Sequence, residues 1–99
     1  MKYVYTALLT PRESGGYECR VPDIPHCVTS GTDLADALAM IEDAATLMLI
    51  VYEDENIPIP PATAPGDIAC DDGVISTLLL LDTSSYRRNY ENNAVKKSA

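Results

Sequence analysis

Residues 17–31 read YECRVPDIPHCVTSG, and this stretch determines where the chain changes from sheet to helix. In its first part, residues 17–21, apolar and charged side chains alternate, which places Tyr17, Cys19 and Val21 on one face. Such alternation is typical of a half-buried antiparallel strand. The two prolines that follow lack a backbone donor, so the strand cannot continue through them as a central strand.

The segments on either side of this strand predict two further strands. Residues 3–10, YVYTALLT, are rich in β-formers, and residues 11–16, PRESGG, form a polar turn with paired glycines. The first 21 residues therefore predict a β-hairpin. Beyond the prolines, residues 27–30 predict a short third strand.

A long helix is predicted after Gly31, which breaks the strand pattern, with Thr32 as the cap. From Asp33 onward, apolar side chains recur at steps of three and four residues, the period of an amphipathic helix. The apolar positions are Leu34, Leu38, Ile41, Ala45, Met48 and Tyr52. Asn56 and Pro58 end this pattern. About 23 residues at 1.5 Å each give a helix of ~35 Å, which must lie across a sheet.

The second half of the chain adds a connection and a strand. Residues 57–66, IPIPPATAPG, hold four of the seven prolines and predict a semi-rigid extended connection. Residues 74–82, VISTLLLLD, form an apolar run between turn signals, which predicts a buried, central strand. Thr83 or Ser84 is expected to cap a polar segment that could be helical. The order β-β-β-α-β predicts an α+β fold, with one long helix on one face of a mostly antiparallel sheet.

Charge is distributed unevenly along the 99 residues, whose net charge is −8. Residues 1–86 contain 14 acidic and three basic residues, a net charge of −11, whereas residues 87–99 carry +3. An acidic body repels phosphate, which argues against direct nucleic-acid binding by residues 1–86 and favours a basic protein partner. A core this small, without Phe or Trp, also favours a homo-oligomer.

The three cysteines and the N-terminus indicate a cytoplasmic protein. An odd number of cysteines in a short chain does not suggest a disulfide framework, so we expect reduced thiols. No secretory signal is recognisable, because polar and charged residues interrupt the first apolar run. The longest fully apolar run, residues 47–52, is too short to span a bilayer.

A metal or catalytic site is the first chemical possibility for the opening stretch, which contains Cys19, Asp23, His26 and Cys27. Zinc ligands usually occur as closely spaced pairs, whereas these cysteines are eight residues apart and Cys19 falls on the apolar face. His26 and Cys27 are neighbours, and on a strand they would point to opposite faces. We favour a buried cysteine and a turn, and we predict no metal, cofactor or catalytic residue.

The carboxylates offer a second possibility, a metal-dependent nuclease of ribonuclease-H type. Such an enzyme needs carboxylates that converge from strand ends, and only Asp23 and Asp82 lie near strand termini. No glycine-rich phosphate loop, G-x-S-x-G or H-E-x-x-H motif is present. A solvated acidic surface that contacts a partner is the simpler interpretation, and the nuclease remains the alternative.

The basic tail offers a third possibility, a stand-alone DNA-binding repressor. Its basic residues are Arg87, Arg88, Lys96 and Lys97. Such a repressor would show salt-sensitive binding to an operator. Four positive charges are a weak signal, and a solvated tail is the simpler interpretation.

The ordered set of features resembles the HicB family of antitoxins along nearly the whole chain. The core of the resemblance is VPDIPHCVTSGTDLADAL, residues 21–38, beside a family pattern close to P-D-L-P-G-C-x-T-x-G. The GGY turn, the IPIPP segment and the YRR…AVKKS region also fit. Two positions depart from the pattern: His26 stands where the family usually has Gly, and Ala35 stands where an acidic residue is common.

The resemblance implies a fold like that of double-stranded-RNA-binding domains or part of ribonuclease H. It implies a protein that neutralises HicA, a small basic mRNA endoribonuclease, by masking its active site. Many members also carry a C-terminal DNA-binding module and repress their own operon. Residues 1–82 would then be the toxin-binding domain, and residues 83–99 a linker to a module that is not present here.

Charge pattern and family role together suggest which residues contact the toxin. We expect an acidic face that contains Asp23, Asp33, Asp36 and Asp43, together with exposed residues of the hairpin. Operator DNA would be a partner only through the C-terminal module. The expected assembly is a dimer or tetramer.

Overall fold

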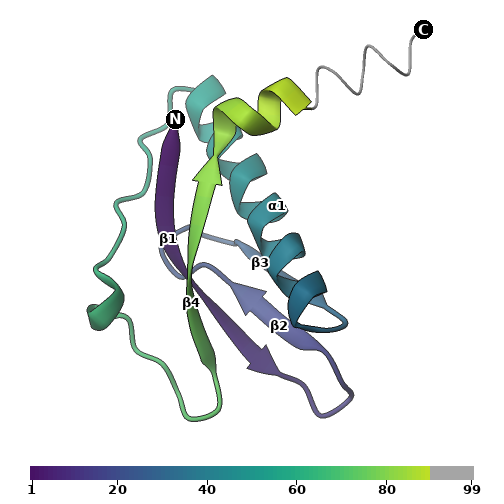
Figure 1. The fold of residues 1–99 in the computed structure, drawn as a ribbon. Helices are drawn as coiled ribbons and strands as arrows, with labels where there is room; N and C mark the ends of the chain where they lie inside the picture. The colour runs from purple at the N-terminus through teal and green to yellow at the C-terminus, as the bar shows by residue number, and fades with distance from the viewer. Residues whose placement is uncertain (90–99) are drawn as a thin grey trace, which may run out of the picture.

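The computed structural model describes residues 1–89, which contain four strands and one long helix in the order β-β-β-α-β (Figure 1). The elements are β1 Lys2–Pro11, β2 Tyr17–Arg20, β3 Val28–Gly31, α1 Leu34–Asp54 and β4 Ile75–Asp82. A short 3-10 helix, Pro65–Asp67, lies between α1 and β4, and residues 83–89 are helical. The predicted α+β fold is confirmed. Within the described residues, no helix is long and apolar enough to cross a membrane.

The strands form one antiparallel sheet in the order β3-β2-β1-β4. The long strand β1 is central, because it pairs with β2 at one end and with β4 along most of its length. The prediction that residues 74–82 form a central strand was therefore wrong, and β4 is an edge strand. An apolar run alone cannot distinguish a central strand from an edge strand, since both give a short hydrophobic segment.

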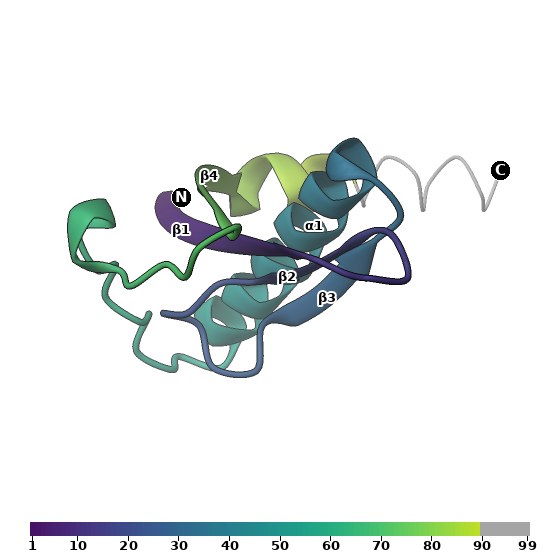
Figure 2. The same cartoon turned by 90° about the horizontal axis from the view of Figure 1, so that it is seen from below.

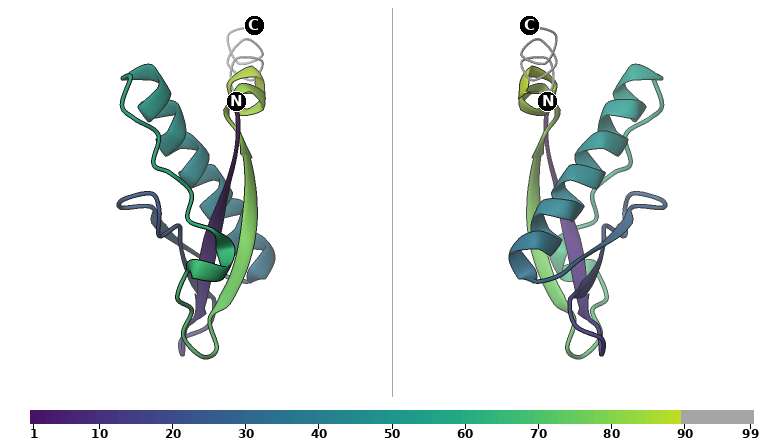
Figure 3. Two further views of the ribbon diagram at one scale, coloured as in Figure 1. Left: turned by 90° about the vertical axis from the view of Figure 1, so that its left-hand side faces the viewer. Right: turned by 90° about the vertical axis from the view of Figure 1, so that its right-hand side faces the viewer.

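Helix α1 covers one face of the sheet, as the two side views show (Figure 3). Seen from below, β1, β2 and β3 lie on the same side of this helix (Figure 2). The odd-numbered residues of β1 and β4 face α1, because strand side chains alternate between the two faces. The buried core consists of Tyr5, Ala7, Leu9, Cys19, Val21, Ile24, Cys27, Ala37, Ile41, Ala45, Leu49, Leu79 and Leu81.

Asp33, and not the predicted Thr32, caps the N-terminus of α1. The Asp33 carboxylate accepts a hydrogen bond of 2.8 Å from the backbone N–H of Asp36. The Asp36 carboxylate in turn accepts from the backbone N–H of Thr32 at 2.8 Å, a reciprocal arrangement like a capping box. At the other end, Asn56 has a φ of 55°, and α1 is 21 residues long.

Gly31 ends β3 at a point where the backbone closely approaches α1. A Cβ atom on Gly31 would lie 2.3 Å from the backbone nitrogen of Ala37. No side chain fits there, so the T-x-G part of the motif permits the close packing of β3 on the helix. The sequence indicated a break at Gly31, and the structure supplies this second reason for glycine.

The proline-rich connection is attached to the core by a few contacts. Ile59 packs against the core, and the hydroxyl of Tyr5 donates a hydrogen bond to the carbonyl of Pro60. After β4, Asp82 caps the helical segment 83–89 by accepting from the backbone N–H of Ser85 at 3.1 Å. The predicted caps, Thr83 and Ser84, lie within that segment instead.

Candidate partner-binding surface

The four predicted contact aspartates lie in three different places. The first, Asp23, belongs to the turn between β2 and β3. Its two carboxylate oxygens accept hydrogen bonds of 2.7 Å from the backbone N–H and the hydroxyl of Thr63. Asp23 therefore fastens this turn to the proline-rich connection.

Asp33 and Asp36 lie at the opposite end of the β2–β3 hairpin, where α1 begins. Both carboxylates take part in the cap described above, and both residues are exposed. Asp43 is exposed on the middle of α1. Of the four predicted residues, Asp36 and Asp43 thus lie on one helix surface, and Asp23 lies apart from them.

An apolar row on α1 was missed by the sequence reasoning. Met40, Leu47 and Val51 have exposed fractions of 44%, 43% and 52%. With the half-buried Ala44, they recur at steps of four, three and four residues, the spacing of a seam that packs against another helix. The signal was present in the sequence as a second apolar periodicity, about 110° around the helix from the buried residues.

Acidic side chains line this apolar row. Asp36 lies one turn before Met40, Asp43 one turn before Leu47, and Asp54 one turn after Val51. We call these six residues the α1 outer surface. Its apolar centre can bury area against a partner, and its acidic rim favours a partner with positive charge. Asp43 also lines a groove with Glu42, Thr46 and Tyr86, between α1 and the helical segment 83–89.

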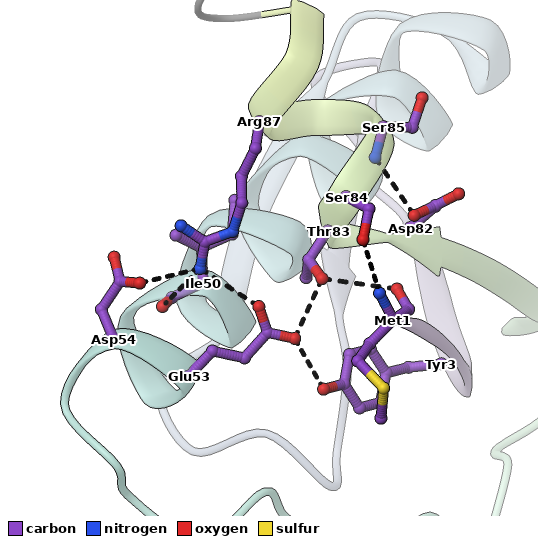
Figure 4. A network of polar contacts seen from close by, with 10 residues as sticks. All are labelled: Met1, Tyr3, Ile50, Glu53, Asp54, Asp82, Thr83, Ser84, Ser85 and Arg87. Carbon is purple, nitrogen blue, oxygen red and sulfur yellow. Dashed lines mark hydrogen bonds and ion pairs between the residues drawn. The ribbon is translucent and has the colours of Figure 1, made fainter.

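A polar network closes the C-terminal end of this surface (Figure 4). One carboxylate oxygen of Glu53 accepts hydrogen bonds from the hydroxyls of Tyr3, at 2.7 Å, and Thr83, at 2.9 Å. The backbone N–H of Thr83 also donates to the carbonyl of Met1 at 3.1 Å. The network therefore joins β1, α1 and the start of the helical segment 83–89.

These contacts shift two pKa values. Burial alone would raise the pKa of Glu53, but hydrogen bonds from Tyr3, Thr83 and Arg87, with the charge of Arg87, lower it below the ordinary value. Burial, followed by the hydrogen bond to Glu53, raises the pKa of Tyr3 to about 12. At neutral pH Glu53 is therefore a stable anion and Tyr3 a stable donor.

The predicted nucleic-acid-contacting tail is only partly described. The guanidinium of Arg87 donates to Asp54 at 2.9 Å, to Glu53 at 3.1 Å and to the carbonyl of Ile50 (Figure 4). Arg88 is exposed on the same helical segment. Lys96 and Lys97 lie outside the described residues. A phosphate would have to compete with two carboxylates for Arg87.

The Cys-Asp-His-Cys stretch contains a turn whose two cysteines lie in the core and whose histidine is exposed. Cys19 and Cys27 are buried, and burial raises the pKa of both thiols. The Cys19 thiol donates to the carbonyl of Ala37 at 3.5 Å. His26 is exposed with a φ of 64°, in the left-handed region where glycine is favoured over other residues. Within residues 1–89, no group of three or more His, Cys, Asp or Glu side chains is placed to hold a metal ion.

The two carboxylates of the nuclease alternative both have structural partners. Asp23 is bound by Thr63, and Asp82 caps the helical segment 83–89. The backbone N–H of Ser85 lowers the pKa of Asp82. Each carboxylate therefore has a local role in holding the chain.

Sequence comparison finds relatives among antitoxins. The chain is 36% identical over 80 residues to Antitoxin HicB 1 of Photorhabdus laumondii, covering 79% of the chain and 52% of that relative. It is 34% identical over 82 residues to Antitoxin HicB of Escherichia coli K12, covering 79% of this chain and 59% of that relative. It is also 34% identical over 56 residues to the UPF0150 protein Ta0767 of Thermoplasma acidophilum, covering 57% of this chain and 81% of that relative. No family model matches.

The chain thus spans about half to three-fifths of the length of the HicB relatives. Similar solved structures include a toxin–antitoxin complex from Streptococcus pneumoniae, with a TM-score of 0.78 and 17% identity over 87% of this chain and 73% of that one. A chain of the HicA3 and HicB3 toxin–antitoxin complex has a TM-score of 0.64 and 23% sequence identity, and the match covers 81% of this chain and 99% of that one. The N-terminal domain of Burkholderia pseudomallei antitoxin HicB has a TM-score of 0.72 and 15% sequence identity, again over 81% of this chain and 99% of that one. These structures establish a shared fold. The sequence relatives show that the chain belongs to the HicB family.

Proposed function

We propose that this chain is the toxin-binding part of an antitoxin that neutralises a small basic HicA-type mRNA endoribonuclease in the cytoplasm. Membership of the HicB family and a net charge of −11 over residues 1–86 support this function. An acidic body attracts a basic toxin and speeds their association. Neutralisation needs only that the antitoxin cover the toxin's active site, so the proposal requires no catalytic residue.

The α1 outer surface is our proposed contact region for the toxin. The observation that carries this choice is the exposed row of Met40, Leu47 and Val51, lined by Asp43 and its neighbours. An apolar centre with a charged rim is the usual anatomy of a specific interface. The helix-like spacing of the row fits a toxin helix with basic flanks.

Single substitutions test this assignment by calorimetric titration of the toxin and by inhibition of its RNA cleavage. Leu47→Lys should weaken toxin binding at least tenfold, because it places a charge in the centre of the interface. The control is Val28→Lys on β3, an apolar residue that is 56% exposed where Leu47 is 43% exposed, and this variant should bind normally. Asp43→Lys should slow association, whereas Asp72→Lys, in the exposed loop before β4, should do so much less.

Two results would argue against the proposal at different levels. Failure of the wild-type chain to bind or inhibit a HicA-type toxin would contradict the antitoxin function. Tight binding by both Leu47→Lys and Asp43→Lys would leave that function intact and move the contact region away from α1. Circular dichroism would establish that each variant is folded.

Repression of the operon is a separate part of the proposal. The resemblance assigns DNA binding to a C-terminal module, so we propose autorepression only for a longer chain that carries such a module. Arg87 binds carboxylates of its own chain, which supports a structural role for it in residues 1–89. Operator binding by the 99-residue chain alone is expected to be weak and non-specific.

A further inference from the structure

We infer that the groove between α1 and the helical segment 83–89 binds an arginine side chain of the toxin, with Glu42 and Asp43 holding its guanidinium. This inference deepens the proposed function and rests on it for the identity of the partner. Three observations carry it: an acidic pair that α1 contains twice, the groove that faces one of the two pairs, and the chemistry of the groove wall.

The first observation is that α1 contains the sequence Glu-Asp at residues 42–43 and again at residues 53–54. The two pairs are eleven residues apart, which is about three turns, so they lie on the same face of the helix ~16 Å from each other. The second pair already binds a guanidinium of the chain itself, because Arg87 donates to both of its carboxylates, at 3.1 Å and 2.9 Å (Figure 4). Arg87 also donates to the carbonyl of Ile50. The end of α1 therefore shows how this pair binds a guanidinium.

The second observation is that the first pair faces a groove. Glu42 and Asp43 are exposed, and within residues 1–89 neither carboxylate makes a hydrogen bond or an ion pair. Ala39, which precedes this pair as Ile50 precedes the other, lines the same groove. The groove has a volume of about 230 Å³, whereas a single water needs only about 10–15 Å³, so it has room for a side chain. The pair is therefore open to a cation from a partner.

The third observation is the groove wall, which favours arginine over lysine. Tyr86, on the helical segment 83–89, lines the groove across from α1. An aromatic ring attracts a cation, and the planar guanidinium also stacks on its face. The fork of an arginine binds two carboxylates at once, as Arg87 does, whereas the ammonium of a lysine is a point charge.

The position of the groove places the bound arginine at the rim of the proposed interface. Asp43 belongs both to the groove and to the α1 outer surface. On its other side the groove continues past Lys2 and Asp82, whose opposite charges offset each other, so the acidic pair leaves it negative. A toxin that covers the apolar row of α1 can therefore insert an arginine beside Tyr86 without leaving that row.

Paired neutral substitutions test the groove by calorimetric titration of the full chain with a HicA-type toxin. Glu42→Gln combined with Asp43→Asn keeps the shape of both side chains and should weaken toxin binding about tenfold or more. The matched control is Asp71→Asn combined with Asp72→Asn, in the exposed loop before β4. It changes the net charge equally and should weaken binding no more than about twofold. Equal losses in the two double variants would overturn the inference, because net charge alone would then explain them.

Replacing the toxin's arginines by lysine, one at a time, identifies the bound residue. One replacement should weaken binding to the wild-type chain about tenfold and have little further effect on binding to the Glu42→Gln, Asp43→Asn variant, as expected for two groups in direct contact. If every replacement had the same effect on both chains, no toxin arginine would occupy the groove and the inference would fail.

Nα-acetylarginine amide tests the groove without the toxin. In nuclear magnetic resonance spectra, millimolar amounts should shift the ring signals of Tyr86, and Nα-acetyllysine amide should shift them less. Absence of these shifts, or shifts that persist in the Glu42→Gln, Asp43→Asn variant, would overturn the inference. Failure of the wild-type chain to bind the toxin, with the arginine shifts present, would instead contradict the proposed function.

Discussion

The carboxylate of Glu53 and the guanidinium of Arg87 lie 3.1 Å apart, although 34 residues separate them in the chain. The same carboxylate receives the hydroxyls of Tyr3 and Thr83, so one side chain holds three segments together. Its position at the end of α1 fixes the direction in which the helical segment 83–89 leaves the sheet (Figure 4). Glu53 is therefore the organising residue of this end of the molecule.

Replacing Glu53 by Gln should lower the free energy of unfolding by about 1–2 kcal/mol, because hydrogen bonds to a charged acceptor are lost. Chemical denaturation at pH 7 measures the change. The control is Glu55→Gln, an exposed residue just past α1, which should have almost no effect. Equal stability of the two variants would show that the network contributes nothing to folding.

The Tyr3–Glu53 pair predicts how stability depends on pH. The pKa of Tyr3 is raised from 10.0 to about 12, so its contribution is complete below pH 10 and is lost as the pH rises towards 12. The pKa of Glu53 is lowered, so its contribution is present above its unfolded value and is lost as the pH falls through the lower folded value.

Tyr3→Phe isolates the alkaline part of this prediction. The difference in unfolding free energy between the wild type and Tyr3→Phe should shrink between pH 10 and 12. Tyrosinate absorbance should lose one group that titrates near pH 12 in the variant. A wild-type chain whose tyrosines all titrate at their ordinary pKa would contradict the hydrogen bond to Glu53.

Gly31→Ala should destabilise the protein by roughly 2 kcal/mol or more, because the new methyl group would collide with the backbone of Ala37 and force β3 away from α1. The control is Gly66→Ala, where no atom lies within 4 Å of the added Cβ. Thermal unfolding of both variants provides the measurement. A Gly31→Ala protein as stable as Gly66→Ala would mean that β3 can shift at little cost.

Thr6→Val should stabilise the protein by up to about 1 kcal/mol, since the Thr6 hydroxyl is buried without a hydrogen-bond partner. Thr46 is also buried, but its hydroxyl donates to the carbonyl of Glu42 at 2.7 Å. Thr46→Val should therefore not raise the free energy of unfolding. Urea denaturation distinguishes the two variants, and a loss of stability in Thr6→Val would indicate that the hydroxyl has a bound water.

Local patterns in the sequence determined the elements and their order. Alternation in residues 17–21, the helical period from Asp33 and the prolines of residues 57–66 each depend on near neighbours, so they could be recognised without the fold. The break at Gly31 was recognised in the same way, whereas the left-handed backbone of His26 became visible only in the structure. The motif of residues 21–38 carried the family resemblance, which the sequence relatives confirmed.

Only the tertiary structure decided which surfaces are buried and which residues meet. The leucines of β4 look alike in sequence, yet Leu79 and Leu81 are in the core while Leu78 and Leu80 are exposed at an edge. The contact role of Asp23 stays a prediction, and only the structure shows that its carboxylate binds Thr63 forty residues away. Strand order and long-range hydrogen bonds depend on how separate elements pack together, and no local period in the chain records that packing.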